Sequence, residues 1–159
     1  PDADVATHTR EFTDYYYGAA APALRRYLDM VCDKCEADDI HVGFNDNPTH
    51  GFLAEPMLDA YDRLFDEAEA AVAGDPLRLG RVGKARLSIR WVRLKRAAML
   101  RGERDPKAIN AFFADWRAHD LSRIDEWCSA ETTHRALLDG LWRGVSYYDH
   151  WADEGGEEF

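Results

Sequence analysis

The chain has 159 residues, of which 46% are hydrophobic and 31% are charged, a composition typical of a folded globular protein. Its formal net charge of −10 argues against a general nucleic-acid or anionic-membrane surface. No apolar run approaches the roughly 20 residues that a membrane-spanning helix needs. We therefore expect no nucleic acid and no membrane among its partners.

The first helical segment is expected to begin near Thr9, to pause at Tyr17 and Gly18, and to continue to Glu36. Its apolar side chains recur at spacings of three and four residues, which places them on one face of a helix. That face consists of Leu24, Tyr27, Leu28, Val31, Cys32 and Cys35. We expect it to lie in the core.

Further helices are predicted at residues 56–72, 76–101, 106–119, 121–127 and 132–143. Asp75 and Asp105 each precede a proline, a pairing that places a carboxylate cap at a helix start. Gly74 and Gly102 are expected to end the preceding helices in the left-handed conformation. No strand pattern is convincing, so the predicted fold class is all-α.

The predicted architecture is a bundle of about five to six helices in which neighbours run antiparallel. This helical domain is expected to cover residues 1–146, and the aromatic and acidic tail at 147–159 is expected to be frayed or docked. The segment 76–101 has apolar side chains on two opposite faces, which predicts that protein covers it on both sides.

Residues 81–101 contain eight basic residues and no acidic one. Such a run by itself would suggest a phosphate or nucleic-acid site. The preceding predicted helix is rich in carboxylates, however, and an antiparallel hairpin would set these opposite the guanidinium groups. We favour this internal pairing over an anion site.

Cys32 and Cys35 have the spacing of a redox pair or of half a zinc site. A second Cys-x-x-Cys motif is missing from the sequence, and both cysteines fall on the predicted core face. Buried cysteine is common in protein cores. We therefore interpret both as inert core thiols and predict no metal and no other cofactor.

The segment 41–52 is the longest irregular stretch and combines aromatic rings, amides, a carboxylate and imidazoles. Sugar sites use flat rings against C–H faces and planar polar groups against hydroxyls. The substrate-contact candidates are Phe44, Asn45, Asp46, His50 and Phe52. The alternative, which we favour, is an ordered interhelical loop with Asn and Asp turn chemistry.

No catalytic residue is predicted, because the sequence has no Gly-x-Ser-x-Gly, phosphate-loop or His-Glu-x-x-His motif.

The segment 11–21, with sequence EFTDYYYGAAA, resembles a motif of the bacterial domain-of-unknown-function family DUF4838, and 64–71 and 81–87 resemble its next two helices. The resemblance covers roughly residues 10 to 100. It implies a helical region that follows a (β/α)₈ barrel similar to those of α-glucuronidases and other glycoside hydrolases. The paired carboxylates of that barrel have no counterpart in this chain, so no family site residue carries over.

Phe12, Tyr15 and Tyr16 of that motif precede Gly18 and three alanines, which we interpret as a packing device that lets another backbone approach closely. The chain opens without a methionine or a leader pattern, which suggests a fragment of a longer protein. The compartment is left undecided.

The resemblance leads us to expect a non-catalytic helical C-terminal accessory domain of a glycoside hydrolase, inactive alone. Its expected partners are the catalytic barrel of the parent chain, a second copy in a homodimer, and carbohydrate at the segment 41–52. Two alternatives stay open. One is a stand-alone carbohydrate-binding module that also uses Tyr147, Tyr148 and Trp151, and the other is a protein-interaction module.

Overall fold

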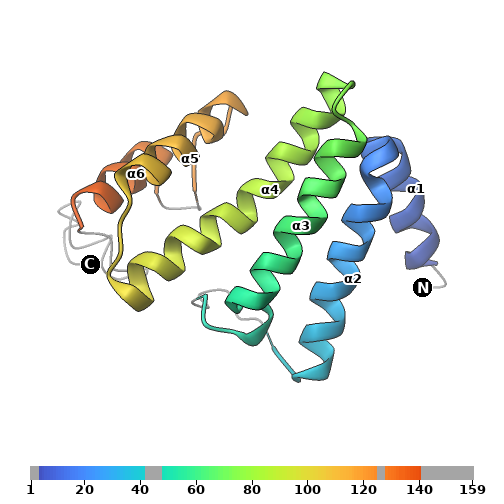
Figure 1. Ribbon diagram of the computed structural model, residues 1–159, viewed down its shortest axis with the longest axis horizontal. Coiled ribbons are helices and arrows are strands. Elements are labelled where there is room, and N and C mark those ends of the chain that lie inside the picture. The colour runs from blue at the N-terminus through green and yellow to red at the C-terminus, as the bar shows by residue number, and fades with distance from the viewer. Residues whose placement is uncertain (1–3, 42–47, 125–127, 141–159) are drawn as a thin grey trace, which may run out of the picture. The chain divides into compact units, whose positions relative to one another are not determined.

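The computed structural model describes residues 4–41, 48–124 and 128–140. These residues form helices and contain no β-strand, apart from one isolated bridge between Arg123 and Ser129. The predicted all-α fold class is therefore confirmed (Figure 1). The described residues divide into two compact units, residues 4–41 and 49–89 in unit 1 and residues 48, 90–124 and 128–140 in unit 2.

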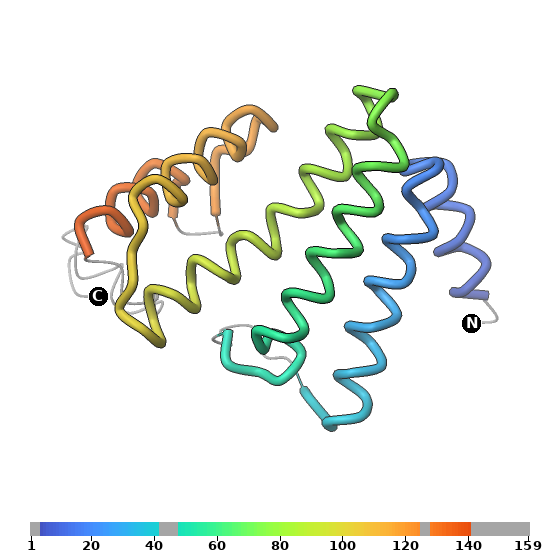
Figure 2. The backbone as a smooth tube through the Cα atoms, in the orientation of Figure 1, coloured from blue at the N-terminus to red at the C-terminus, as the bar shows by residue number. Residues whose placement is uncertain are grey.

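Unit 1 is built from consecutive helices that alternate in direction, as the colour gradient along the backbone shows (Figure 2). Its elements are α1 (Val5–Tyr17), η1 (Gly18–Ala20), α2 (Ala21–Ala37), η2 (Gly51–Leu53), α3 (Glu55–Ala71) and the first part of α4 (Pro76–Arg96). The interruption expected near Gly18 is the short 3₁₀ turn η1, which packs against α3. The antiparallel arrangement of neighbours is confirmed within this unit.

The core of unit 1 centres on α3, where most of the apolar residues expected on one face are buried, although Met57 is half-buried and Ala71 is exposed. Its fully or nearly buried members are Leu58, Tyr61, Leu64, Phe65, Ala68 and Val72. The Tyr27 ring of α2 packs against Tyr61 and Phe65, with ring centroids 5.1 Å apart in both pairs. The Tyr61 hydroxyl donates a hydrogen bond of 3.0 Å to the Phe52 carbonyl, which ties η2 to α3.

The core face predicted for α2 is partly wrong. Leu24 is buried, but Leu28 is 41% exposed and Cys32 is exposed as well. The apolar periodicity of α2 therefore continues past Leu24, where full burial does not. Periodicity reports which side chains share a face and says nothing about how far along the helix a partner extends.

Unit 2 contains the rest of α4, the π-helical turn η3 (Ala97–Arg101), α5 (Pro106–Ala118) and α6 (Ala130–Leu138). Its buried apolar side chains include Ile109, Phe112, Phe113 and Leu137. The Trp91 ring stacks on Phe112 at a centroid distance of 5.6 Å, and α5 packs against α6. Of the apolar residues expected in the core from 106–119, Ile109, Phe112 and Phe113 are buried and Trp116 is half-buried. In the segment predicted at 132–143, Leu137 is buried but Leu138 is 39% exposed.

Two predicted backbone features differ in the structure. Gly102 has the expected left-handed conformation, with φ of +64°, but Gly74 does not, because α3 ends at Val72 with ordinary backbone angles. The helix predicted at 121–127 is wrong over residues 121–124, where Arg123 instead bridges Ser129. Ser129 then caps α6 by accepting a hydrogen bond from Thr132 N. The tail at 147–159 lies outside the described residues.

Candidate functional site

The predicted sugar-contact segment is described only in part. Phe44, Asn45 and Asp46 lie outside the described residues. His50 and Phe52 are half-buried, and their rings stack with centroids 5.8 Å apart. The structure thus brings together two of the five candidates, on and just before η2, and the sugar site itself stays a prediction.

The cysteine pair does not lie in the core as predicted. Cys32 is exposed and Cys35 is partly exposed on α2. Partial burial and the neighbouring Cys32 raise the pKa of the Cys35 thiol, which favours the protonated form over the thiolate. Within the described residues no group of three or more His, Cys, Asp or Glu side chains is arranged to hold a metal ion.

Arg86 of the basic run on α4 pairs with carboxylates of the preceding helix, as predicted. Arg86 lies between three carboxylates of α3, with N–O distances of 2.9 Å to Asp62, 2.7 Å to Asp66 and 3.0 Å to Glu69. Its side chain is 19% exposed, so the pairs form in a partly desolvated environment. In unit 2, Arg90 pairs with Asp115 of α5 at 2.6 Å.

Helix α1 turns a polar side chain toward the rest of unit 1. Thr13 is 2% exposed, and its hydroxyl donates to the Thr9 carbonyl at 2.8 Å. Arg25 of α2 donates to the same hydroxyl at 2.8 Å and also pairs with Asp14. The contact between α1 and α2 therefore includes buried hydrogen bonds on the side where an amphipathic helix usually places apolar groups.

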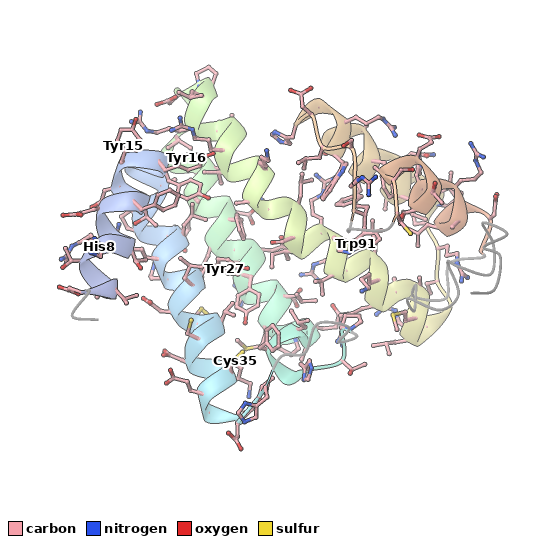
Figure 3. The ribbon with its side chains drawn as sticks, turned by 180° about the vertical axis from the view of Figure 1, so that it is seen from behind. His8, Tyr15, Tyr16, Tyr27, Cys35 and Trp91 are labelled. Atoms are coloured by element: carbon pink, nitrogen blue, oxygen red, sulfur yellow. The ribbon has the colours of Figure 1, made fainter. Side chains whose placement is uncertain are left out.

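An adjoining side of α1 carries apolar and aromatic side chains, most of which face solvent. Val5 is 72% exposed, Phe12 58% and Tyr15 79%. Together with His8 and Tyr16 they follow the spacing i, i+3, i+7, i+10 and i+11, which places all five on one helix face. We call these five residues the α1 aromatic face; Figure 3 shows His8, Tyr15 and Tyr16 along α1.

Tyr16 anchors this face to α4. The Arg81 guanidinium lies over the Tyr16 ring, 4.2 Å from its centroid, and also donates to the Tyr16 carbonyl at 2.8 Å. Phe12 stacks on Tyr16 with centroids 5.4 Å apart and ring planes inclined by 12°. Two of the rings are thus held in place before any partner arrives, which lowers the entropy that binding would cost.

The interpretation of this motif as a packing device agrees with the full burial of Ala20 and Ala21, whereas Phe12 and Tyr15 are exposed. What approaches Gly18 is also not another backbone but the side chain of Arg78. The helical spacing correctly places the aromatic residues together, but which face of α1 meets α2 is decided by the Thr13–Arg25 hydrogen bond. One sequence signal for this orientation is a threonine in the middle of the predicted helix, Thr13, followed twelve residues later by Arg25.

Comparisons with protein-family models, with curated proteins and with solved structures find no match for this chain. The resemblance to the DUF4838 family therefore stays a prediction that rests on the three sequence segments. Among the described residues, no helix combines the length and the apolar character that crossing a bilayer requires.

Proposed function

We propose that this chain is a non-catalytic helical accessory domain that holds a neighbouring protein body on the α1 aromatic face. The neighbour expected from the family resemblance is the catalytic barrel of a glycoside hydrolase. The observation that carries the proposal is the exposure of Val5, Phe12 and Tyr15 along one face of α1.

The exposure of these apolar side chains to water is unfavourable in the isolated chain. Covering an exposed apolar side chain contributes about 25 cal/mol for each Å² removed from water, so three such residues favour an additional contact. Contiguous exposed apolar groups commonly mark protein interaction sites. Aromatic residues are also enriched at such sites, since their rings cover much area at a low cost in side-chain entropy.

Cysteine labelling tests the proposal. In a background with Cys32→Ser and Cys35→Ser, Tyr15→Cys is compared between the 159-residue chain and the longer protein that the resemblance predicts. We expect maleimide to label Tyr15→Cys at least tenfold more slowly in the longer protein. Leu77→Cys is the control, because Leu77 is a 63% exposed residue on α4, and its labelling rate should be the same in both proteins.

Equal labelling rates for Tyr15→Cys in the two proteins would contradict the proposal. A rate that falls with increasing concentration of the 159-residue chain would instead show that a second copy covers the face, which sedimentation analysis would detect as a dimer.

The carbohydrate-binding alternative is favoured by the stacked rings of His50 and Phe52. It predicts heat on titration with oligosaccharides that Phe52→Ala abolishes.

A further inference from the structure

We propose that unit 2 contains a binding pocket for a small amphipathic carboxylate, meaning one carboxylate group attached to a short apolar chain. The pocket has a volume of about 270 Å³ and lies among the end of α4, η3, the start of α5 and Leu137 of α6. That volume is close to the lower end of the range for small-molecule sites. The site is separate from the α1 aromatic face.

The charged part of the lining comes from three arginines and two carboxylates. Arg93, Arg101 and Arg104 line the pocket together with Glu103 and Asp105. Arg101 pairs with Glu103 at 2.6 Å, and Asp105 accepts a hydrogen bond from Lys107 N as the cap of α5. Both carboxylates are therefore engaged, and the lining has one positive charge in excess, which suits a monoanion better than a dianion.

The strongest evidence for an anion site comes from Arg104. Its Nη1 and Nη2 atoms donate to the carbonyls of Gly102 and Gly140 at 3.4 and 3.5 Å, which are long contacts. Its Nε atom is shielded from solvent and has no acceptor within the described part of the chain. A guanidinium group has five donors and a shape that matches a carboxylate, so a bound carboxylate would supply the strong acceptor that these contacts lack.

The remaining lining is apolar and accounts for the second part of the ligand. Ala98, Ile109 and Leu137 are at most 7% exposed, and together with Leu94 and Ala97 they line the rest of the pocket. Two of these residues belong to η3, a π-helical turn of a kind that is rare and often found at functional sites. A short hydrocarbon chain fits this lining, whereas inorganic phosphate would leave it unfilled.

Titration followed by NMR tests the pocket directly, with sodium hexanoate as probe and 1-hexanol and inorganic phosphate as comparisons. We expect hexanoate to shift the amide signals of residues 97–109 with a millimolar Kd, and to bind at least tenfold more tightly than 1-hexanol or phosphate. Arg104→Gln should weaken hexanoate binding at least tenfold. Lys107→Gln is the matched control. It also removes one positive charge, but Lys107 lies on α5 outside the pocket lining, so the affinity for hexanoate should be unchanged.

Ala108→Phe provides a second variant that does not depend on Arg104. Ala108 is exposed on α5 and lines the pocket, so a phenyl ring there would occupy the space without disturbing the core. We expect this variant to unfold at the wild-type temperature and to bind hexanoate at least tenfold more weakly. Equal affinity for hexanoate and 1-hexanol, tighter binding of phosphate than of hexanoate, or full affinity in either variant would overturn the proposal.

Discussion

The Arg86 guanidinium lies 2.9 Å from Asp62 Oδ1, and this ion pair connects α4 to α3 across a partly desolvated contact. Asp66 and Glu69 complete the set of acceptors around the same guanidinium. One guanidinium thereby pairs with three carboxylates of α3, and the cluster keeps a net negative charge. The relationship explains why a run of basic residues on α4 does not present a continuous cationic surface in unit 1.

Arg86→Met is expected to lower the free energy of unfolding by about 2 kcal/mol, between the values for exposed and fully buried ion pairs. The cause is that Asp62, 24% exposed, and Glu69, 33% exposed, would lose their ion pairs with Arg86. Urea denaturation measures the change. Arg26→Met is the control: Arg26 and Glu67 are both more than half exposed, so the loss should stay below about 0.5 kcal/mol. Equal losses in the two variants would show that burial does not matter here.

Tyr61 is expected to make unit 1 sensitive to alkaline pH. Burial raises the pKa of Tyr61 to about 12, and the neighbouring Tyr27 and Cys35 act in the same direction. Because the folded state holds this proton more tightly than the unfolded chain, whose tyrosine pKa is about 10, the stabilisation is complete below pH 10. It is lost as the pH rises from 10 toward 12, which urea titrations over that range would measure.

Tyr61→Phe separates this effect from general alkaline denaturation. The variant loses the hydrogen bond to the Phe52 carbonyl, so it should be less stable by about 1 kcal/mol at pH 8. Its stability should fall less steeply than that of the wild type between pH 10 and 12. Some decline should remain, because burial also raises the pKa of Tyr27. Identical slopes would rule out Tyr61 as the group responsible.

His134 is expected to make unit 2 sensitive to mild acid. Burial, assisted by the nearby Arg117, lowers the pKa of His134, whose ring stacks on Phe113 at 4.5 Å and lies 2.7 Å from Asn110 Oδ1. The folded state therefore favours the neutral imidazole. Its contribution to stability is complete above the unfolded pKa of about 6.5 and is lost as the pH falls through the lower folded value.

NMR titration of the imidazole should show His134 protonating below pH 6.5. The free energy of unfolding should also fall more between pH 7.5 and 5 in the wild type than in His134→Gln. If the free energies of unfolding of the wild type and His134→Gln differ by the same amount at pH 7.5 and at pH 5, this assignment is contradicted.

Gly18→Ala is expected to destabilise unit 1 by about 1–2 kcal/mol or more. Gly18 has a φ of +57°, and a methyl group there would collide with the Arg78 side chain. Gly74→Ala is the control, since that position has open space around it and is not among the glycines with positive φ. There we expect no loss and a gain of up to about 1 kcal/mol. Thermal unfolding compares the two, and a Gly74→Ala variant as unstable as Gly18→Ala would contradict the explanation.

The sequence pattern predicts the fold best where a helix face lies fully within a unit. On α3 the spacing from Leu58 to Ala68 matches the buried residues, because this stretch packs against η1, α2 and η2. The pairing of Arg86 with α3 follows from the same antiparallel arrangement. Asp105 and Pro106 likewise mark the start of α5 as expected.

The pattern fails where a third element or the tertiary environment decides the outcome. The orientation of α1 depends on the hydrogen bond between Arg25 and Thr13, which the aromatic spacing does not indicate. The proposed pocket likewise combines Arg104 with residues of η3 and α6, and the π-helical turn has no signature in the apolar periodicity. The apolar periodicity predicts neither feature.

Helix α4 continues without a break from Ile89 in unit 1 to Arg90 in unit 2. Cleaving the chain between these residues would create two new helix ends, each with backbone groups that lose their hydrogen-bond partners. Neither unit can therefore be isolated by cutting the chain in a loop. Unfolding of α4 in one unit would also break helical hydrogen bonds at the start of the other. We therefore expect the two units to unfold together, because the backbone hydrogen bonds of α4 cross the boundary between Ile89 and Arg90.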